Sequence, residues 1–153
     1  MWSTFGVLLM TLALNLTEVR TLYQAALDDS DKADELVKTT KGSTQAIYKA
    51  YYGAGLAFQA KHSWNPATKL SKASDASTQL NAAVKAAPSD LEVRFLRFAF
   101  ESSVPSMLNL SEHVAEDKKW ILANKNTSHA MWSVMKKFLK GCSALTEAEK
   151  KTL

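Results

Sequence analysis

Apolar residues recur every three or four positions along most of the chain, and residues 80–100 show this spacing most clearly. Leu80, Ala83 and Val84 form a one-sided apolar stripe, as expected of a helix that packs on a partner. Pro88 ends that helix, because proline has no N–H and disfavours helical geometry in the residue before it. A second apolar run follows almost at once. The pattern therefore predicts two helices, joined by a tight corner, that fold back on each other.

The residues after Pro88 carry the signals that start a helix. Ser89 is the expected N-cap, and the side chain of Glu92, three residues later, can reach back to the backbone N–H of Ser89. Asp90 adds negative charge at the positive end of the helix dipole. We therefore predict a capping box formed by Ser89 and Glu92.

The helix after this corner is apolar on nearly its whole circumference, which is typical of a helix at the centre of its domain. Arg94, Arg97 and Glu101 interrupt the apolar pattern along one face. One interpretation is a partly buried ion-pair ladder, with Asp90 and Glu101 as partners along the helix and residues 116–117 as partners from a neighbour. The alternative is a pair of guanidinium groups that binds a carboxylate or phosphate of a ligand.

The remaining chain shows further helical stripes separated by polar or proline-containing turns. They lie at residues 19–27, 33–37, 44–58, 69–87, 111–122 and 130–140. Residues suited to N-capping lie just before several of the predicted helices. They are Asp29, Ser43 or Thr44, Ser111, and Thr146 with Glu149. The chain is therefore predicted to be all-α and built of antiparallel helical hairpins in one compact domain.

Gly53 and Gly55 lie inside one of these predicted helices, beside several alanines. Small residues on a helix let a neighbouring helix approach closely, and we expect this role for both glycines. The alternative is a fragment of a dinucleotide-binding loop. That loop would need a preceding strand and a further glycine at the position of Phe58, and neither is present in the sequence pattern.

The helix before the corner resembles part of a tetratricopeptide repeat. Ala76, Leu80, Ala83 and Pro88 have the spacing of the second helix of that repeat. The first helix of the repeat does not match, since Trp64 stands at its glycine position. The resemblance covers about half of one repeat, and it implies a right-handed α-α arrangement of the helices.

Three longer segments resemble a small secreted family of Gram-negative bacteria that has no assigned activity. These segments are HSWNP at 62–66, KAAPSDLEVRFLRF at 85–98 and VPSMLNLSEHVAEDKKWIL at 104–122. The family combines a signal peptide with a tetratricopeptide-like helical domain. The resemblance therefore implies a fold and a location, and it implies no chemistry.

The length of 153 residues and the apolar content of 46% fit a single domain with one core. Residues 5–16 form an apolar run at the N-terminus that is too short to span a bilayer but suits a secretory signal peptide. We therefore divide the chain into a leader at 1–16 and a helical domain at 17–153, in a secreted or periplasmic protein. The alternative is a buried N-terminal helix in a cytoplasmic protein.

The net charge, the single cysteine and the histidines indicate neither a nucleic-acid partner nor a metal site. The net charge is +4 and the lysines concentrate near the C-terminus, but no arginine-rich or aromatic-interleaved patch accompanies them, so no nucleic-acid partner is expected. Cys142 is the single cysteine, so no thiolate cluster can form within the chain. His113 and His129 have no ligand at a metal-binding spacing, and we expect neither a metal nor a cofactor.

His62 and Trp64 lie in the turn before Pro66 and are the second pair of candidate binding residues, beside Arg94 and Arg97. An indole ring offers a broad contact surface and an N–H donor at the rim of a ligand site. The alternative is a tryptophan that packs over a helix end.

No catalytic motif accompanies these candidate residues. The chain lacks the motifs of serine hydrolases, zinc peptidases and nucleotide hydrolases. We therefore expect a non-enzymatic binding or scaffold module that contacts a protein, a peptide or a small anionic ligand. The alternative is a small-ligand-binding protein or an enzyme that uses an anion site at Arg94 and Arg97.

Overall fold

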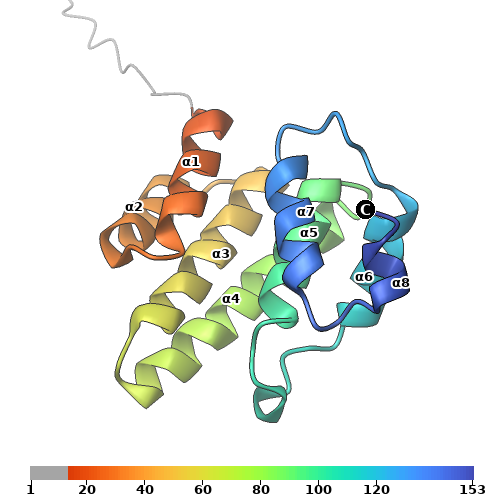
Figure 1. Ribbon diagram of the computed structural model, residues 1–153. Helices are drawn as coiled ribbons and strands as arrows, with labels where there is room; N and C mark the ends of the chain where they lie inside the picture. The colour runs from red at the N-terminus through yellow and green to blue at the C-terminus, as the bar shows by residue number, and fades with distance from the viewer. Residues whose placement is uncertain (1–13) are drawn as a thin grey trace, which may run out of the picture.

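The computed structural model describes residues 14–153, and in this range the regular structure consists of helices without strands (Figure 1). The all-α prediction is confirmed. The elements are α1 (Leu16–Ala26), α2 (Ser30–Thr40), α3 (Ala46–His62), α4 (Pro66–Ala86), α5 (Leu91–Glu101), a short 3-10 turn (Ser106–Leu108), α6 (Val114–Ala123), α7 (Trp132–Gly141) and α8 (Glu147–Lys150).

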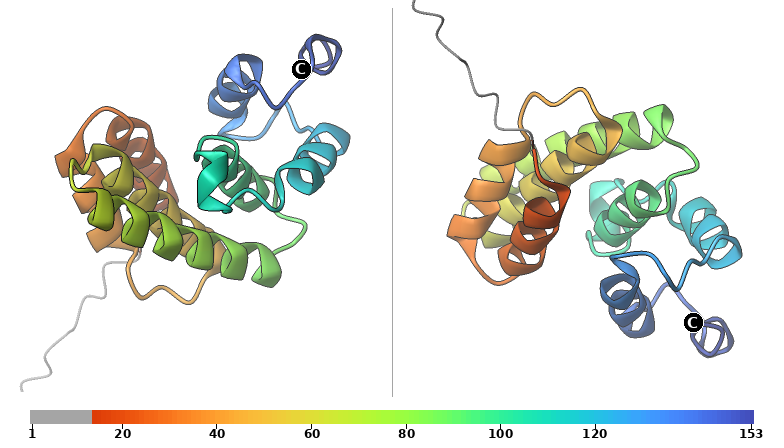
Figure 2. Two further views of the ribbon diagram at one scale, coloured as in Figure 1. Left: turned by 90° about the horizontal axis from the view of Figure 1, so that it is seen from below. Right: turned by 90° about the horizontal axis from the view of Figure 1, so that it is seen from above.

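Helices α1 to α4 form two consecutive hairpins with short turns (Figures 1 and 2). Asp29 and Asn65, at two predicted breaks, accept hydrogen bonds from backbone N–H groups of the first turns of α2 and α4, and Asn15, within the expected leader, does the same for α1. Pro66 occupies the first turn of α4, where the missing N–H costs nothing. Helix α3 contacts α1, α2, α4 and α5, so it forms the axis of this half of the molecule.

The two glycines of α3 lie where neighbouring helices come close on either side. A Cβ at Gly53 would lie 2.8 Å from Leu80 Cγ of α4, and a Cβ at Gly55 would lie 2.8 Å from Val37 Cγ2 of α2. The prediction that these small residues permit close helix approach is confirmed. Neither contact leaves room for a methyl group without movement of the neighbour.

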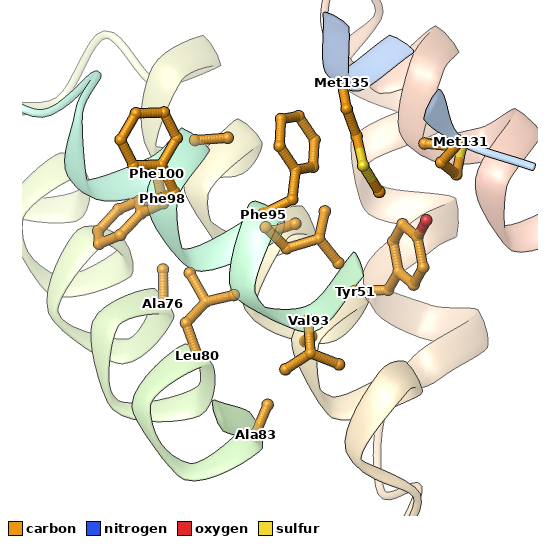
Figure 3. Packing of buried hydrophobic residues seen from close by; sticks show 14 of the residues in the cluster. Tyr51, Ala76, Leu80, Ala83, Val93, Phe95, Phe98, Phe100, Met131 and Met135 are labelled. Carbon is orange, nitrogen blue, oxygen red and sulfur yellow. The ribbon is translucent and has the colours of Figure 1, made fainter. Parts of the chain in front are cut away.

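Helix α5 lies at the centre of the molecule, with α3 and α4 on one side and the C-terminal helices on the other (Figure 2). All of its residues are buried, including its four charged ones. Val93, Phe95 and Phe98 lie in the main apolar cluster (Figure 3). The rings of Phe95 and Phe98 meet Phe138 of α7 edge-on, at centroid distances of 5.6 and 6.3 Å. The expected central position of this helix is confirmed.

Lys118 connects two of the C-terminal helices to one another. Lys118 of α6 pairs with Glu149 of α8 at 3.1 Å and also donates to the carbonyl of Ala144. Thr146 and Glu149 form the predicted capping box at the start of α8. The lysine-rich end of the chain is thus partly neutralised by intramolecular contacts.

Three of the expected helix starts are wrong by a few residues. The N-cap of α5 is Asp90, which accepts from Val93 N–H, so Ser89 and Glu92 form no capping box. Glu92 lies in the interior instead, where Arg20 of α1 and Tyr51 of α3 donate hydrogen bonds to its carboxylate. Helix α6 begins after His113, and Ser111 donates its hydroxyl to the carbonyl of Glu101 rather than capping that helix. Helix α3 begins after Gln45, without a side-chain cap from Ser43 or Thr44.

The expected leader at 1–16 lies mostly outside the described residues, which begin at Leu14. Within the described part, Leu14 and Leu16 pack against the core, and the carbonyl of Leu14 accepts a hydrogen bond from the hydroxyl of Tyr48 at 2.8 Å. The last residues of the expected leader thus contact the helical domain. None of the described helices is both long enough and apolar enough to cross a membrane.

Candidate binding site at the turn between α3 and α4

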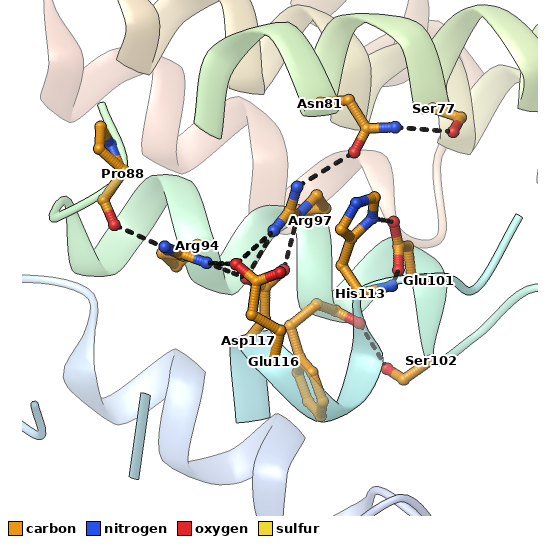
Figure 4. Close-up of polar contacts among 11 residues, drawn as sticks. Ser77, Asn81, Pro88, Arg94, Arg97, Glu101, Ser102, His113, Glu116 and Asp117 are labelled. Carbon is orange, nitrogen blue, oxygen red and sulfur yellow. Dashed lines mark hydrogen bonds and ion pairs between the residues drawn. The ribbon is translucent and has the colours of Figure 1, made fainter. Parts of the chain in front are cut away.

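Arg94 and Arg97 are engaged by carboxylates of α6, as the ladder interpretation expected (Figure 4). The fully buried carboxylate of Asp117 receives two bonds from Arg97, Nε to Oδ2 at 2.7 Å and Nη2 to Oδ1 at 2.8 Å. Asp117 Oδ1 also accepts from Arg94 Nη1 at 2.8 Å. Arg97 Nη1 donates further to the side-chain oxygen of Asn81 on α4 at 3.2 Å.

The remaining contacts of Arg94 complete this ion-pair ladder. Arg94 Nε donates to the carbonyl of Pro88 at 2.7 Å, Nη1 contacts Glu116, and the guanidinium group lies 5.5 Å from the centre of the Trp120 ring. Burial alone would lower the pKa of Arg94, but its hydrogen bonds to Asp117 and Glu116 raise it. The same contact with Arg94 lowers the pKa of Glu116. Both guanidinium groups are therefore neutralised from within the chain.

The local partners predicted for these arginines along α5 are wrong. Asp90 is used as the N-cap of α5, and Glu101 binds His113 instead, accepting from its backbone N–H at 2.6 Å and contacting its Nδ1 at 2.8 Å. This pair lines a small hollow of about 150 Å³ together with Asn81. The sequence showed His113 as an isolated histidine, because its partner belongs to another helix.

A second buried polar cluster, centred on Glu92, was missed entirely. Glu92 is 2% exposed and receives two bonds from Arg20 of α1, Nε to Oε1 at 2.9 Å and Nη2 to Oε2 at 2.6 Å. The hydroxyl of the buried Tyr51 on α3 donates to the same carboxylate, and His129 Nε2 lies 3.6 Å from it. In the sequence, only the presence of the acidic Glu92 within an apolar helix indicated this cluster, and it did not identify Arg20, Tyr51 or His129 as partners.

The other pair of candidate residues lies at the far end of α3, beside an open polar hollow. This hollow has a volume of about 300 Å³ and lies among the ends of α2, α3 and α4. Its lining side chains are all polar or charged: Ser30, Asp34, Gln59, His62, Ser63, Thr68 and Lys72. It shares no lining residue with the Arg94–Arg97 ladder, so the structure separates the two predicted pairs.

His62 lines this hollow and has one nitrogen committed to the fold. His62 Nε2 lies 2.8 Å from the carbonyl of Ala26, and since a carbonyl only accepts, Nε2 must carry the proton. Lys61 Nζ also contacts the carbonyl of Leu27. These bonds hold the turn between α1 and α2 against the C-terminal end of α3.

Gln59 is the least satisfied of the polar groups that line the hollow. Its Nε2 donates to Asp34 Oδ1 at 2.7 Å, whereas its Oε1 is buried and has no donor within the described part of the chain. This interaction with Asp34 also determines which way the amide points, because reversing it would place Oε1 against a carboxylate oxygen. A buried acceptor without a donor costs about 1–3 kcal/mol of stability.

Trp64 follows Ser63 in the turn and exposes 90% of its surface. The alternative prediction, a tryptophan that packs over a helix end, is therefore wrong. The turn itself is well held, because the side chain of Asn65 accepts from the backbone N–H groups of Ala67 and Thr68 at 2.9 and 3.1 Å. A large aromatic ring is thus presented to solvent by an ordered turn.

Comparison with known protein families, with curated proteins and with solved structures finds no match to this chain. Within residues 14–153, no group of three or more His, Cys, Asp or Glu side chains is arranged to hold a metal ion. The candidate site therefore consists of the polar hollow, which His62 and Ser63 line, and of the exposed Trp64, which follows Ser63 in the chain.

Proposed function

We propose that this protein is a non-enzymatic binding module that docks a protein or peptide at the turn between α3 and α4. The observation that carries the proposal is Trp64, which exposes 90% of its surface on a turn held by Asn65. Exposed aromatic side chains on rigid elements serve as anchors at interfaces, because they bury a large area at little entropic cost. The hairpins would act as the scaffold that presents this anchor.

Two further elements of the proposal rest on the sequence. The tetratricopeptide-like spacing around Pro88 supports a right-handed stacking of the hairpins, and proteins built in that way commonly bind peptides or partner proteins. The apolar run at residues 5–16 and the resemblance to a secreted family support export to the periplasm or beyond.

The anion-binding alternative has little geometric support. Asp117 and Glu116 already occupy the guanidinium groups of Arg94 and Arg97, so an anionic ligand would have to displace a buried intramolecular carboxylate. Displacing it would leave the fully buried Asp117 carboxylate unpaired in a low-dielectric interior. A site at Trp64 requires no such disruption.

The proposal is tested by selecting random linear peptides on phage against the immobilised full-length chain and measuring the affinity of the selected peptides. We expect Trp64→Ala to weaken their binding at least about tenfold, because truncation of an anchor residue typically costs about 2 kcal/mol or more. Met107→Ala is the matched control, since Met107 is 87% exposed but lies on the 3-10 turn. Equal binding to both variants, or the absence of any selected peptide, would contradict the proposal.

A further inference from the structure

The smaller hollow, of about 150 Å³, lies among α4, the end of α5 and the loop before α6. Two carboxylates line it, those of Glu101 and Glu112, together with the imidazole of His113, and its lining contains no lysine or arginine. It shares no lining residue with the hollow beside the α3–α4 turn. The charge of this lining therefore favours a cationic ligand over an anionic one.

Glu101 differs from the other buried carboxylates in having no arginine or lysine partner within the described residues. Glu92 pairs with Arg20, and Asp117 pairs with both arginines of α5. Glu101 is 2% exposed, and its two oxygens contact only His113, at the backbone N–H and at ring Nδ1. Buried charges are ordinarily paired, so the positive charge that balances Glu101 has to come from His113 or from a bound cation.

The neighbouring ion-pair ladder does not supply this charge. Arg97 approaches the hollow only through Asn81, whose side-chain oxygen accepts its hydrogen bond at 3.2 Å. The two guanidinium groups of the ladder already meet two carboxylates, those of Glu116 and Asp117. The ladder is thus balanced within itself.

His113 offers the hollow one accessible acceptor. A carboxylate only accepts hydrogen bonds, so Nδ1 carries the proton that faces Glu101, and in the neutral ring Nε2 keeps a lone pair. The side chain of His113 is 27% exposed, and the accessible part lies on the ring edge that Glu101 does not cover. Figure 4 shows the ring beside Glu101 and below Asn81 of α4.

From this arrangement we infer that the hollow binds the ammonium group of a primary amine, one N–H of which donates to His113 Nε2. The charge of the ligand would balance the two carboxylates of the lining, Glu101 through the imidazole and Glu112 directly from the rim. A volume of about 150 Å³ holds a methylammonium ion with room for an alkyl stem, given about 30 Å³ for one water molecule. The site does not involve Trp64, and it goes beyond the function proposed above.

The test reads the ring nitrogen directly, because replacing His113 would leave the buried Glu101 without a partner. The full-length protein, labelled with ¹⁵N in its histidines, is titrated with methylammonium chloride at pH 8 and constant ionic strength. We expect a saturable shift of the His113 Nε2 signal, with the signals of His62 and His129 unchanged. Tetramethylammonium has the same charge but no N–H group, and we expect it to leave the Nε2 signal unshifted.

Two glutamates serve as matched variants. Glu112→Gln removes an exposed charge of the hollow, and we expect it to weaken methylammonium binding about two- to fivefold. Glu18→Gln removes an exposed charge of α1 and should leave the binding unchanged. Equal weakening in the two variants would reduce the effect to the overall charge of the protein and would overturn the inference.

The source of the ammonium group is tested with N-acetyl-lysine amide. A shift of the same signal at lower concentration than methylammonium requires would assign the site to lysine side chains, and a shift with methylammonium alone would assign it to free small amines. The inference is overturned if neither compound shifts Nε2. It is also overturned if the free protein carries both ring protons on His113 at pH 8, since the charge of Glu101 would then be balanced within the chain.

Discussion

Asp117 is the common buried partner of the two arginines of the central helix. It is fully buried and accepts hydrogen bonds from both Arg94 and Arg97, which come from the central helix. Glu116, its neighbour in sequence, contacts the same arginines but keeps 58% of its side chain exposed. The two carboxylates thus offer a matched pair for measuring what burial adds to an ion pair.

We expect Asp117→Ala to lower the free energy of unfolding by about 3–5 kcal/mol, because it leaves two buried guanidinium groups without their main partner. Glu116→Ala should cost less than about 1 kcal/mol, since solvent screens a half-exposed pair. Urea denaturation followed by circular dichroism measures both values. Similar losses in the two variants would show that the ladder is not a buried ion pair.

At the scale of elements, the absence of a side chain at Gly53 allows α3 and α4 to pack closely. A Cβ at Gly53 would lie 2.8 Å from Leu80 Cγ and 3.2 Å from the carbonyl oxygen of Ala76, and a backbone oxygen cannot move aside without shifting its helix. Gly141 is the last residue of α7, and a Cβ added there would have no neighbouring atom of the described chain within 4 Å.

Gly53→Ala should therefore lower the free energy of unfolding by about 1–3 kcal/mol through overpacking. Gly141→Ala should raise it by up to about 1 kcal/mol, because alanine loses less backbone entropy in a helix. Thermal unfolding of the two variants beside the unmodified protein gives both changes. A stabilised Gly53→Ala protein would mean that the helices separate easily at this point.

At the scale of the whole molecule, the cluster around Glu92 connects the N-terminal hairpins to the centre. Arg20 of α1, Tyr51 of α3 and Glu92 of α5 meet there, and the loop before α7 contributes His129. Burial, followed by the nearby Glu92 carboxylate and its hydrogen bond, raises the pKa of Tyr51 above the ordinary value of 10.0. The unfolded chain therefore ionises this tyrosine at lower pH than the folded chain does.

This difference makes stability depend on alkaline pH. The contribution of Tyr51 is fully present below its unfolded pKa of 10.0 and is lost as the pH rises above it. We expect Tyr51→Phe to reduce the slope of unfolding free energy against pH between about pH 9 and 11. Urea denaturation across this range measures the slope, with Tyr52→Phe as the control. An unchanged slope in Tyr51→Phe would contradict the buried hydrogen bond to Glu92.

The helices were largely predictable because their signals are local. Pro66 begins α4 and Pro88 lies between α4 and α5, as the proline backbone favours, and Asp29 caps α2 through groups only two and three residues away. The apolar circumference of residues 91–100 placed α5 at the centre before its neighbours were known. The sequence predicted that the glycines of α3 allow close helix approach, but it did not predict Leu80 and Val37 as the residues that they contact.

The candidate site was predictable only in part. The turn that contains His62 and Trp64 was recognised as a candidate, but the sequence left open both a ligand rim and packing of the tryptophan over a helix end. Nothing in the sequence singled out Gln59, because the lack of a donor near its Oε1 depends on how the described helices pack around it. The sequence around Glu92 predicted a capping role for this residue. In the structure its carboxylate binds Arg20 instead, which lies 72 residues away in the chain.

By itself, then, the sequence determined the helical character of the chain, the positions of most turns and the identity of the central helix. These depend on side-chain spacing, on proline geometry and on hydrogen bonds within a few residues. Only the tertiary structure decided between the ion-pair ladder and a free anion site at Arg94 and Arg97, and only it showed where Glu92 and Glu101 find their partners. It also decided that Trp64 faces solvent, because exposure depends on the whole surrounding chain and not on the residues beside it.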